Sequence, residues 1–121
     1  MIPFVVVRVN MAITTEQELE LKTRLGQAIG LVPGKSEEHL LVGIEDKCRL
    51  FLVGDGQTPL VYLEVSVFGN EAHAGYAAFT KAATQSLQDV GGIVPDHVYL
   101  RFSDVAAWGV SGRYVDRRML G

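Results

Sequence analysis

The chain opens with a short apolar run rich in β-branched residues, and this run constrains the fold more than any other segment. Residues 4–9 read Phe-Val-Val-Val-Arg-Val, which has the length and composition of a strand that is buried on both faces or nearly so. Pro3 precedes the run, and a strand accepts proline at its first position because this residue need not donate to the hydrogen-bond ladder. We therefore expect a buried strand at residues 4–9 that begins at Pro3.

The first segment with helical periodicity follows this strand. Thr15 with Glu18 three residues later predicts a capping box at the start of a helix. Apolar residues then recur at helical spacing as far as Pro33-Gly34, which ends the pattern. We expect a helix at about residues 15–30.

A second helical pattern lies in the other half of the chain. Asn70 is a favourable N-cap, and Gly91-Gly92 supplies a C-terminal stop. The apolar face expected for this helix consists of Ala72, Tyr76, Phe79, Ala83, Leu87 and Val90.

Apolar runs predict the remaining strands. These are expected at residues 40–44, 49–53, 60–68 and 98–102. The segment 104–112, which carries Trp108, is expected to be a loop, and residues 113–120 a last short strand or an extension.

This order of elements predicts an α+β fold made of two β-α-β halves. A strand that crosses over a helix to its neighbour lies parallel to it, so we expect one four-stranded mixed sheet with both helices on one face. The apolar strand residues cannot all point at the helices, so we expect the opposite face to be apolar and covered by self-association. The residues in question are Val5, Val7, Val61, Leu63 and Val65.

Composition indicates one globular domain over residues 1–121, since hydrophobic residues make up 48% and charged residues 21%. The net charge of -3 and the scattered basic residues argue against nucleic acid or an anionic membrane as a partner. No signal peptide or membrane span is expected, which makes the cytoplasm the default location. The single Cys48 excludes a disulfide framework.

The three histidines lie in separate expected elements without metal-ligand spacing, so no metal site is expected. They are His39, His73 and His97.

Several short motifs occur together along nearly the whole chain. They are Pro3 with residues 4–9, Gly34-Lys35, Val67-Phe68-Gly69, Val94-Pro95-Asp96-His97-Val98-Tyr99 leading to Phe102-Ser103-Asp104, and, more loosely, residues 108–112. In this order and spacing the sequence resembles the macrophage migration inhibitory factor family of the tautomerase superfamily. The resemblance implies a homotrimer in which three sheets form a barrel with the helices outside.

The same resemblance implies a function. Family members interconvert keto and enol forms of α-keto acids such as phenylpyruvate, without a cofactor, and use the secondary amine of an N-terminal proline. By position, Pro3 is implied as the catalytic base and Lys35 as the group that binds the substrate carboxylate. The other implied substrate-binding residues are Phe68 through its backbone N–H, Tyr99 from a neighbouring subunit, Arg101 as a bidentate carboxylate partner, and Trp108 near a subunit boundary.

The position of Pro3 sets a condition on this chemistry. An α-amino group titrates near pH 8, and burial beside Lys35 would lower its pKa and make it a base. Here Met1 and Ile2 precede Pro3, and we expect Met1 to be retained because Ile2 is too large for methionine aminopeptidase. The nitrogen of an internal proline is a tertiary amide without a basic lone pair. We therefore predict weak or absent activity unless Pro3 becomes the N-terminus.

Two other functions stay open at this stage. One is a non-catalytic trimer of the same family that binds a ligand or a protein partner in a cytokine-like role. The other is a ferredoxin-like regulatory domain, which shares the same order of elements. The singled-out residues also have structural explanations. Pro3 can simply start a strand, and Lys35 can be a solvated charge. Tyr99 can pack its ring within the protein, and Arg101 can pair with Glu64 instead of a ligand.

Overall fold

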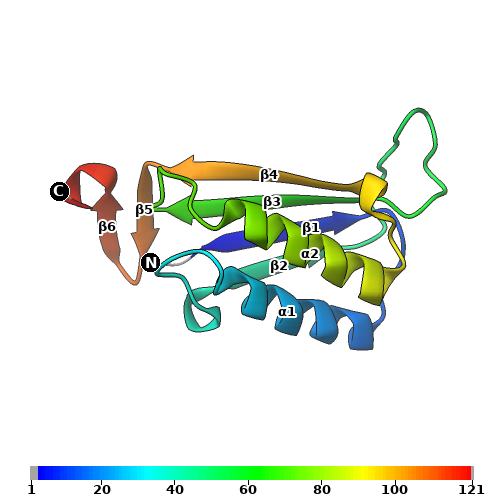
Figure 1. The fold of residues 1–121 in the computed structure, drawn as a ribbon, viewed down its shortest axis with the longest axis horizontal. Helices are drawn as coiled ribbons and strands as arrows, with labels where there is room; N and C mark the ends of the chain where they lie inside the picture. Colours follow the sequence, from blue (N-terminus) through cyan, green and yellow to red (C-terminus); the bar gives the residue numbers. More distant parts are fainter. Residues whose placement is uncertain (1–2, 121) are drawn as a thin grey trace.

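A computed structural model describes residues 3–120. It contains a four-stranded sheet, two α-helices packed on one face of that sheet, and a small hairpin at one end (Figure 1). The strands of the sheet are β1 (Phe4–Val9), β2 (Leu41–Glu45), β3 (Val61–Phe68) and β4 (Val98–Val105). The helices are α1 (Thr15–Ile29) and α2 (Tyr76–Gly91), and the hairpin consists of β5 (Ala107–Val110) and β6 (Arg113–Asp116). Short 3₁₀ turns lie at Glu37–His39, Pro95–His97 and Arg117–Leu120.

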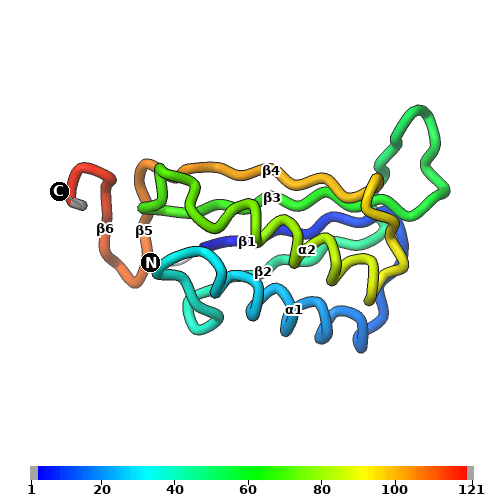
Figure 2. Tube along the Cα trace, in the orientation of Figure 1, coloured from blue at the N-terminus to red at the C-terminus, as the bar shows by residue number. Residues whose placement is uncertain are grey.

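The strand order β2-β1-β3-β4 confirms the two predicted β-α-β halves. β1 is parallel to β2, β3 is parallel to β4, and the antiparallel pair β1–β3 joins the halves in the middle of the sheet. Figure 2 shows α1 crossing from β1 to β2 and α2 from β3 to β4. Each helix therefore connects strands that are direct neighbours. The split β-α-β unit of a ferredoxin-like domain inserts another strand between them, so that alternative is excluded.

The core lies between the sheet and the two helices, and it corrects one expectation. The register pairs Val5 with Val65 and Val7 with Leu63, so these side chains project from the same face. All four are fully buried, as is Val61, and they share one cluster with the inner sides of α1 and α2. The prediction that they could not all face the helices is therefore wrong. Their positions along the two strands are separated by even numbers, and the pleat places such residues on one side.

The face turned away from the helices is consequently mixed rather than apolar. It carries Arg8 near the C-terminal end of β1, and the Arg8 guanidinium donates to Glu45 at 2.7 Å and to Glu64 at 2.9 Å. Tyr62 and Ser66 alternate along β3 with the buried residues and are only partly covered. This alternation is typical of a sheet with one face on the core and one toward water.

α1 begins at Thr15 as predicted, but the N-terminal caps of both helices differ from the predicted ones. In α1 the reciprocal capping bonds join Thr14 and Gln17, one residue earlier than expected, with Gln17 N–H donating to Thr14 Oγ1 at 3.1 Å. α2 begins only at Tyr76. Asn70 instead caps a preceding turn, since its Oδ1 accepts the Ala74 N–H at 3.2 Å. Gly75 is the N-cap residue of α2, and its φ of 81° lets the chain turn into the helix.

The segments outside the sheet also differ from expectation. The predicted strand at residues 49–53 is a loop with an isolated bridge between Leu52 and Asp55. The region 104–112, expected to be a loop, contains the end of β4 and all of β5. Within residues 3–120, no helix combines the length and apolar character that a membrane crossing requires.

Candidate functional site

Three of the predicted site residues meet at one end of the sheet. The antiparallel register pairs Phe4 with Ser66, so Pro3 lies beside the C-terminal end of β3. Pro3 and Phe68 are both buried. The Lys35 ammonium group donates a hydrogen bond to the Phe68 carbonyl oxygen at 2.7 Å. The topology therefore brings a proline, a lysine and a strand-end backbone together from segments that are distant in sequence.

Lys35 reaches this position from the turn that follows α1. Its N–H donates to the Val32 carbonyl at 3.1 Å, and Gly34 before it has φ of 76°, a conformation that favours glycine. The side chain is half-buried, and desolvation lowers the pKa of the ammonium group below its ordinary value. Among residues 3–120, Lys35 forms no salt bridge. It is therefore a partly dehydrated amine held by a neutral acceptor, not a freely solvated charge.

A polar cluster that was not predicted lies at the same end. The Asp104 carboxylate binds the His73 imidazole, with Nε2 and Oδ2 2.6 Å apart, and accepts a hydrogen bond from the Tyr76 hydroxyl at 3.2 Å. The Tyr76 ring stacks on Phe102 with centroids 4.4 Å apart. Gly75 packs directly on the Leu31 backbone at the start of the Lys35 turn. Sequence reasoning missed the cluster because it depends on the left-handed conformation of His73 (φ 60°), which no periodic pattern signals.

Tyr76 gives this cluster a testable pH dependence. Desolvation first, and then the Asp104 charge, raise the pKa of Tyr76 from 10.0 to about 12. Between these pH values the unfolded chain loses a proton that the folded chain keeps, so the free energy of unfolding decreases as pH rises through this window. We expect a decrease on the order of 1 kcal/mol. Tyr76→Phe keeps the stacked ring, and denaturant unfolding at several pH values should show that it removes this part of the decrease. Parallel pH profiles for the two proteins would contradict the assignment.

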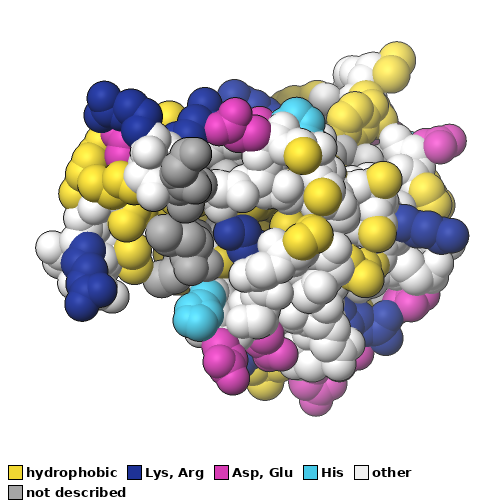
Figure 3. All heavy atoms as spheres, turned by 60° about the vertical axis from the view of Figure 1, so that its left-hand side comes forward, with side chains coloured by type: hydrophobic (Ala, Val, Ile, Leu, Met, Phe, Trp, Pro, Cys, Tyr) yellow, Lys and Arg dark blue, Asp and Glu magenta, His cyan; other side chains and the backbone are white. Residues whose placement is uncertain are grey.

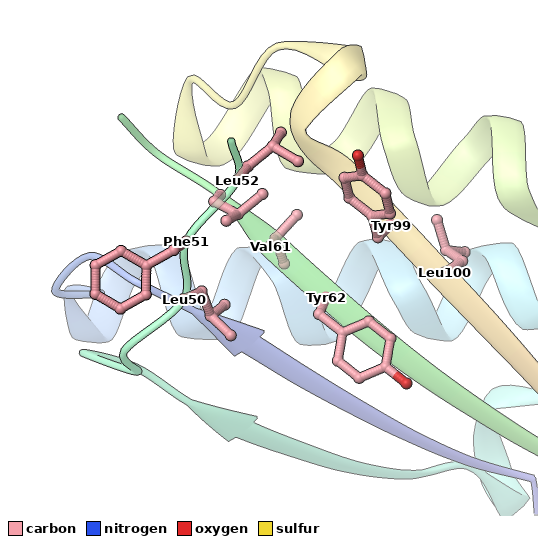
Figure 4. A pocket seen from close by; sticks show the side chains of 8 residues that line it. Leu50, Phe51, Leu52, Val61, Tyr62, Tyr99 and Leu100 are labelled. Atoms are coloured by element: carbon pink, nitrogen blue, oxygen red, sulfur yellow. The ribbon is translucent and has the colours of Figure 1, made fainter. Parts of the chain in front are cut away.

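The other predicted residues lie elsewhere in the same chain. Tyr99 is at the opposite end of the sheet, where it lines an apolar pocket of about 290 Å³ together with Phe51 and Tyr62. Figure 4 shows these three rings around the pocket, from the loop before β3, from β3 and from β4. Arg101 is exposed in the middle of β4. A single chain therefore does not place Tyr99 or Arg101 beside Pro3.

Arg101 also lacks its expected protein partner. Glu64 is its register neighbour across β3 and β4, but the Glu64 carboxylate binds Arg8 instead. Among the described residues, Arg101 makes no side-chain hydrogen bond or salt bridge. Its guanidinium group is free to bind an anionic group from outside this chain.

Trp108 lies on β5, next to the end of the sheet where Pro3 is found (Figure 1). Its indole Nε1–H is enclosed and has no acceptor within residues 3–120. Buried indole donors usually find a partner, so this part of the hairpin has an unsatisfied hydrogen-bonding requirement.

The end of the molecule that carries these groups has no dominant charge. Figure 3 turns it toward the viewer and shows basic, acidic and apolar side chains interspersed. In the described part of the chain, no group of three or more histidine, cysteine or carboxylate side chains is arranged to hold a metal ion.

Solved structures define the class to which this fold belongs. A crystal structure of Leishmania major MIF2 matches with a TM-score of 0.86 and 19% identity, covering 94% of this chain and 97% of that one. Pt0534 inactivated by 2-oxo-3-pentynoate matches with a TM-score of 0.83 and 18% identity, covering 98% of each chain. An R7 fused 4-OT asymmetric trimer matches with a TM-score of 0.81 and 16% identity, covering 97% of this chain and 98% of that one. The chain therefore has the same fold as these three proteins.

The sequence identifies the family within that class. The family model described as macrophage migration inhibitory factor (MIF) matches residues 2–114. The chain belongs to the macrophage migration inhibitory factor family, as its motifs predicted. A comparison with curated proteins found no match.

Proposed function

We propose that this protein is a cofactor-independent keto–enol tautomerase of small 2-oxo acids, phenylpyruvate among them, when Pro3 is the N-terminal residue. The observation that carries the proposal is the burial of Pro3 at the strand end where the Lys35 ammonium group binds the Phe68 backbone. The structural likeness to Pt0534 inactivated by 2-oxo-3-pentynoate, itself a 2-oxo acid, supports this substrate class.

The chemistry needs one proton carrier and one carboxylate anchor. As a free secondary amine, the Pro3 nitrogen takes the proton from C3 of the keto acid and returns it to the C2 oxygen, which gives the enol. Burial disfavours the protonated amine and so lowers its pKa toward neutrality. Lys35 binds the substrate carboxylate by a charge-assisted hydrogen bond, and the backbone N–H of Phe68 is its neighbouring donor.

We further propose that the site is completed in a homotrimer. The Tyr99 side chain is 48% exposed, and Arg101 has no partner in the described part of the chain, so both are available to the Pro3 end of a neighbouring copy. The unsatisfied Trp108 Nε1–H and the likeness to a 4-OT trimer agree with such an assembly. Sedimentation should give the mass of three chains, whereas a monomer at the assay concentration would contradict this arrangement.

A non-catalytic role is the second candidate, and one feature favours it. As long as Ile2 is joined to Pro3, the Pro3 nitrogen is an amide and cannot carry a proton. The same trimer would then keep Lys35 and Arg101 as anchors, and would act as a binding module for an anionic ligand or a protein partner.

Replacement of Lys35 tests the proposed carboxylate anchor. In a chain that begins at Pro3, Lys35→Met should raise KM for phenylpyruvate about tenfold or more, because a hydrogen bond to a charged group contributes about 1.5–3 kcal/mol. Steady-state kinetics measure this effect. Lys81→Met is the matched control, since Lys81 is exposed on α2, and its KM should not change. An unchanged KM in Lys35→Met would remove Lys35 from the binding site.

A further inference from the structure

An apolar pocket lies at the Tyr99 end of the sheet, apart from Pro3 and Lys35 of the same chain. Tyr62 and Tyr99 are register partners on β3 and β4, and Phe51 lines the pocket from the loop before β3 (Figure 4). The other lining residues are aliphatic, and they are Leu50, Leu52, Leu60, Val61 and Leu100. The only polar side-chain atoms among the lining residues are therefore the two tyrosine hydroxyl oxygens.

The size and the lining of the pocket suit one aromatic ring. Its volume is about 290 Å³, roughly twice that of an apolar cavity of about 150 Å³ that binds benzene. A phenyl ring with a short substituent therefore fits. Aromatic side chains also attract other rings beyond the effect of buried area, and a mostly apolar cavity with a few polar groups is the usual form of a small-molecule site.

The wall of the pocket that carries Phe51 is held in place without a ligand. The Asn10 side chain, just after β1, donates to the carbonyl oxygens of Gly56 at 3.3 Å and Thr58 at 2.9 Å. Its Oδ1 accepts the Leu60 N–H at 2.8 Å. The Phe51 ring packs on Gly56, where an added Cβ would lie 2.7 Å from the ring. Such a preformed wall lowers the entropy cost of binding.

A cationic side chain lies next to the pocket. Arg101 follows Tyr99 by two residues on β4, so it projects from the same face, about 6.6 Å further along the strand. Its guanidinium group has no partner in the described part of the chain. A ligand with its ring in the pocket can therefore direct a carboxylate toward Arg101.

We propose that this pocket receives the aromatic side chain of the substrate, and that the substrates are aryl 2-oxo acids in preference to short aliphatic ones. Phe51 and Tyr62 are then specificity-determining residues, and neither was selected from the sequence. The inference rests on the proposed function, in which Tyr99 and Arg101 meet the Pro3 end of a neighbouring copy. It deepens that function by assigning the selection of the aromatic ring to a pocket outside the Pro3 and Lys35 segments.

Binding of two unreactive acids to the full chain tests the pocket. 3-Phenylpropanoate has the ring and the carboxylate but no 2-oxo group, and propanoate lacks the ring as well. Isothermal titration calorimetry should give a Kd about tenfold or more lower for 3-phenylpropanoate, because its ring is buried. Phe51→Ser and Tyr62→Ser should each raise that Kd about two- to tenfold and leave the Kd of propanoate unchanged. Leu19→Ser is the control, since Leu19 is 53% exposed on α1, outside the pocket.

Two results of this titration would overturn the proposal. One is an equal Kd for the two acids, or a Kd for 3-phenylpropanoate that Phe51→Ser and Tyr62→Ser leave unchanged while circular dichroism shows both variants folded. The other is a trimer that binds no 3-phenylpropanoate, which would mean that a neighbouring chain fills the pocket.

A kinetic comparison separates this inference from the proposed tautomerase. In a chain beginning at Pro3, exchange of the C3 protons with D₂O is followed by NMR for phenylpyruvate and for 2-oxobutanoate. Phe51→Ser should lower kcat/KM about two- to tenfold for phenylpyruvate only. Binding of 3-phenylpropanoate that depends on Phe51, without any exchange activity, would refute the proposed function alone. Exchange activity that Phe51→Ser changes equally for both substrates, or for neither, would refute the pocket assignment alone.

Discussion

Removal of Met1 and Ile2, so that the chain begins at Pro3, is expected to raise kcat/KM for phenylpyruvate tautomerisation by about 10²- to 10⁴-fold, the usual contribution of a positioned acid–base group. The reason is a change of functional group. The internal Pro3 nitrogen is a tertiary amide, whereas the exposed one is a secondary amine near Lys35 with a pKa in the range where a base operates. An ultraviolet assay of enol formation measures the change, with the N-terminus of each sample verified by intact mass.

A chain that begins at Ile2 is the matched control. It has lost Met1 but keeps Pro3 as an amide, so it should remain as inactive as the full sequence. If the full sequence, with Met1 and Ile2 demonstrated by mass, is as active as the chain beginning at Pro3, the base is not Pro3. A chain beginning at Pro3 that folds and trimerises but shows no activity would favour the binding-module alternative.

Leu25→Ala is expected to lower the free energy of unfolding by about 2–5 kcal/mol. Leu25 lies on the inner side of α1, is fully buried and belongs to the cluster that includes Val5, Val65 and Phe79. Truncation removes apolar contacts and leaves a cavity between the helices and the sheet, which well-packed neighbours fill only in part. Denaturant unfolding followed by circular dichroism gives the difference.

Leu19→Ala provides the matched control on the same helix. Leu19 is 53% exposed, and alanine has the higher helix propensity, so its effect should stay below about 1 kcal/mol. Both variants are compared with the parent at one protein concentration, because the stability of an oligomer depends on concentration. Equal losses for Leu19→Ala and Leu25→Ala would mean that the inner side of α1 does not form the core.

The fold was predictable where a sequence pattern is local and strong. The Phe4–Val9 run, the two helical periods and the crossover rule gave the four-stranded mixed sheet, and the structure confirms it. Facing directions were not predictable in the same way. Whether Val5 and Val65 point to the same side of the sheet depends on the register between β1 and β3. This register is set when two segments that are distant in sequence pair, so neither strand's own sequence reveals it.

The candidate site was likewise predictable only in part. Pro3, Lys35 and Phe68 were selected through a family resemblance, and the structure brings their segments together at one sheet end. The bond between His73 and Asp104 could not be found, because it joins a residue with positive φ to the end of a strand extended beyond its predicted limit. The joint roles of Tyr99 and Arg101 remain predictions, because they concern a neighbouring copy.

The central place of β1 in the sheet has a consequence for the order of events during synthesis. β1 precedes all other elements in sequence, yet one of its two neighbours, β3, is made last of the three strands β1, β2 and β3. The 59 residues that follow Val9, up to Phe68, take roughly 3–12 s to synthesise at 5–20 residues per second. Throughout this interval β1 lacks its β3 partner. After β3 pairs, Pro3 is buried. Trimming that exposes the proline nitrogen is therefore easier before β1 pairs with β3 than after the sheet is complete.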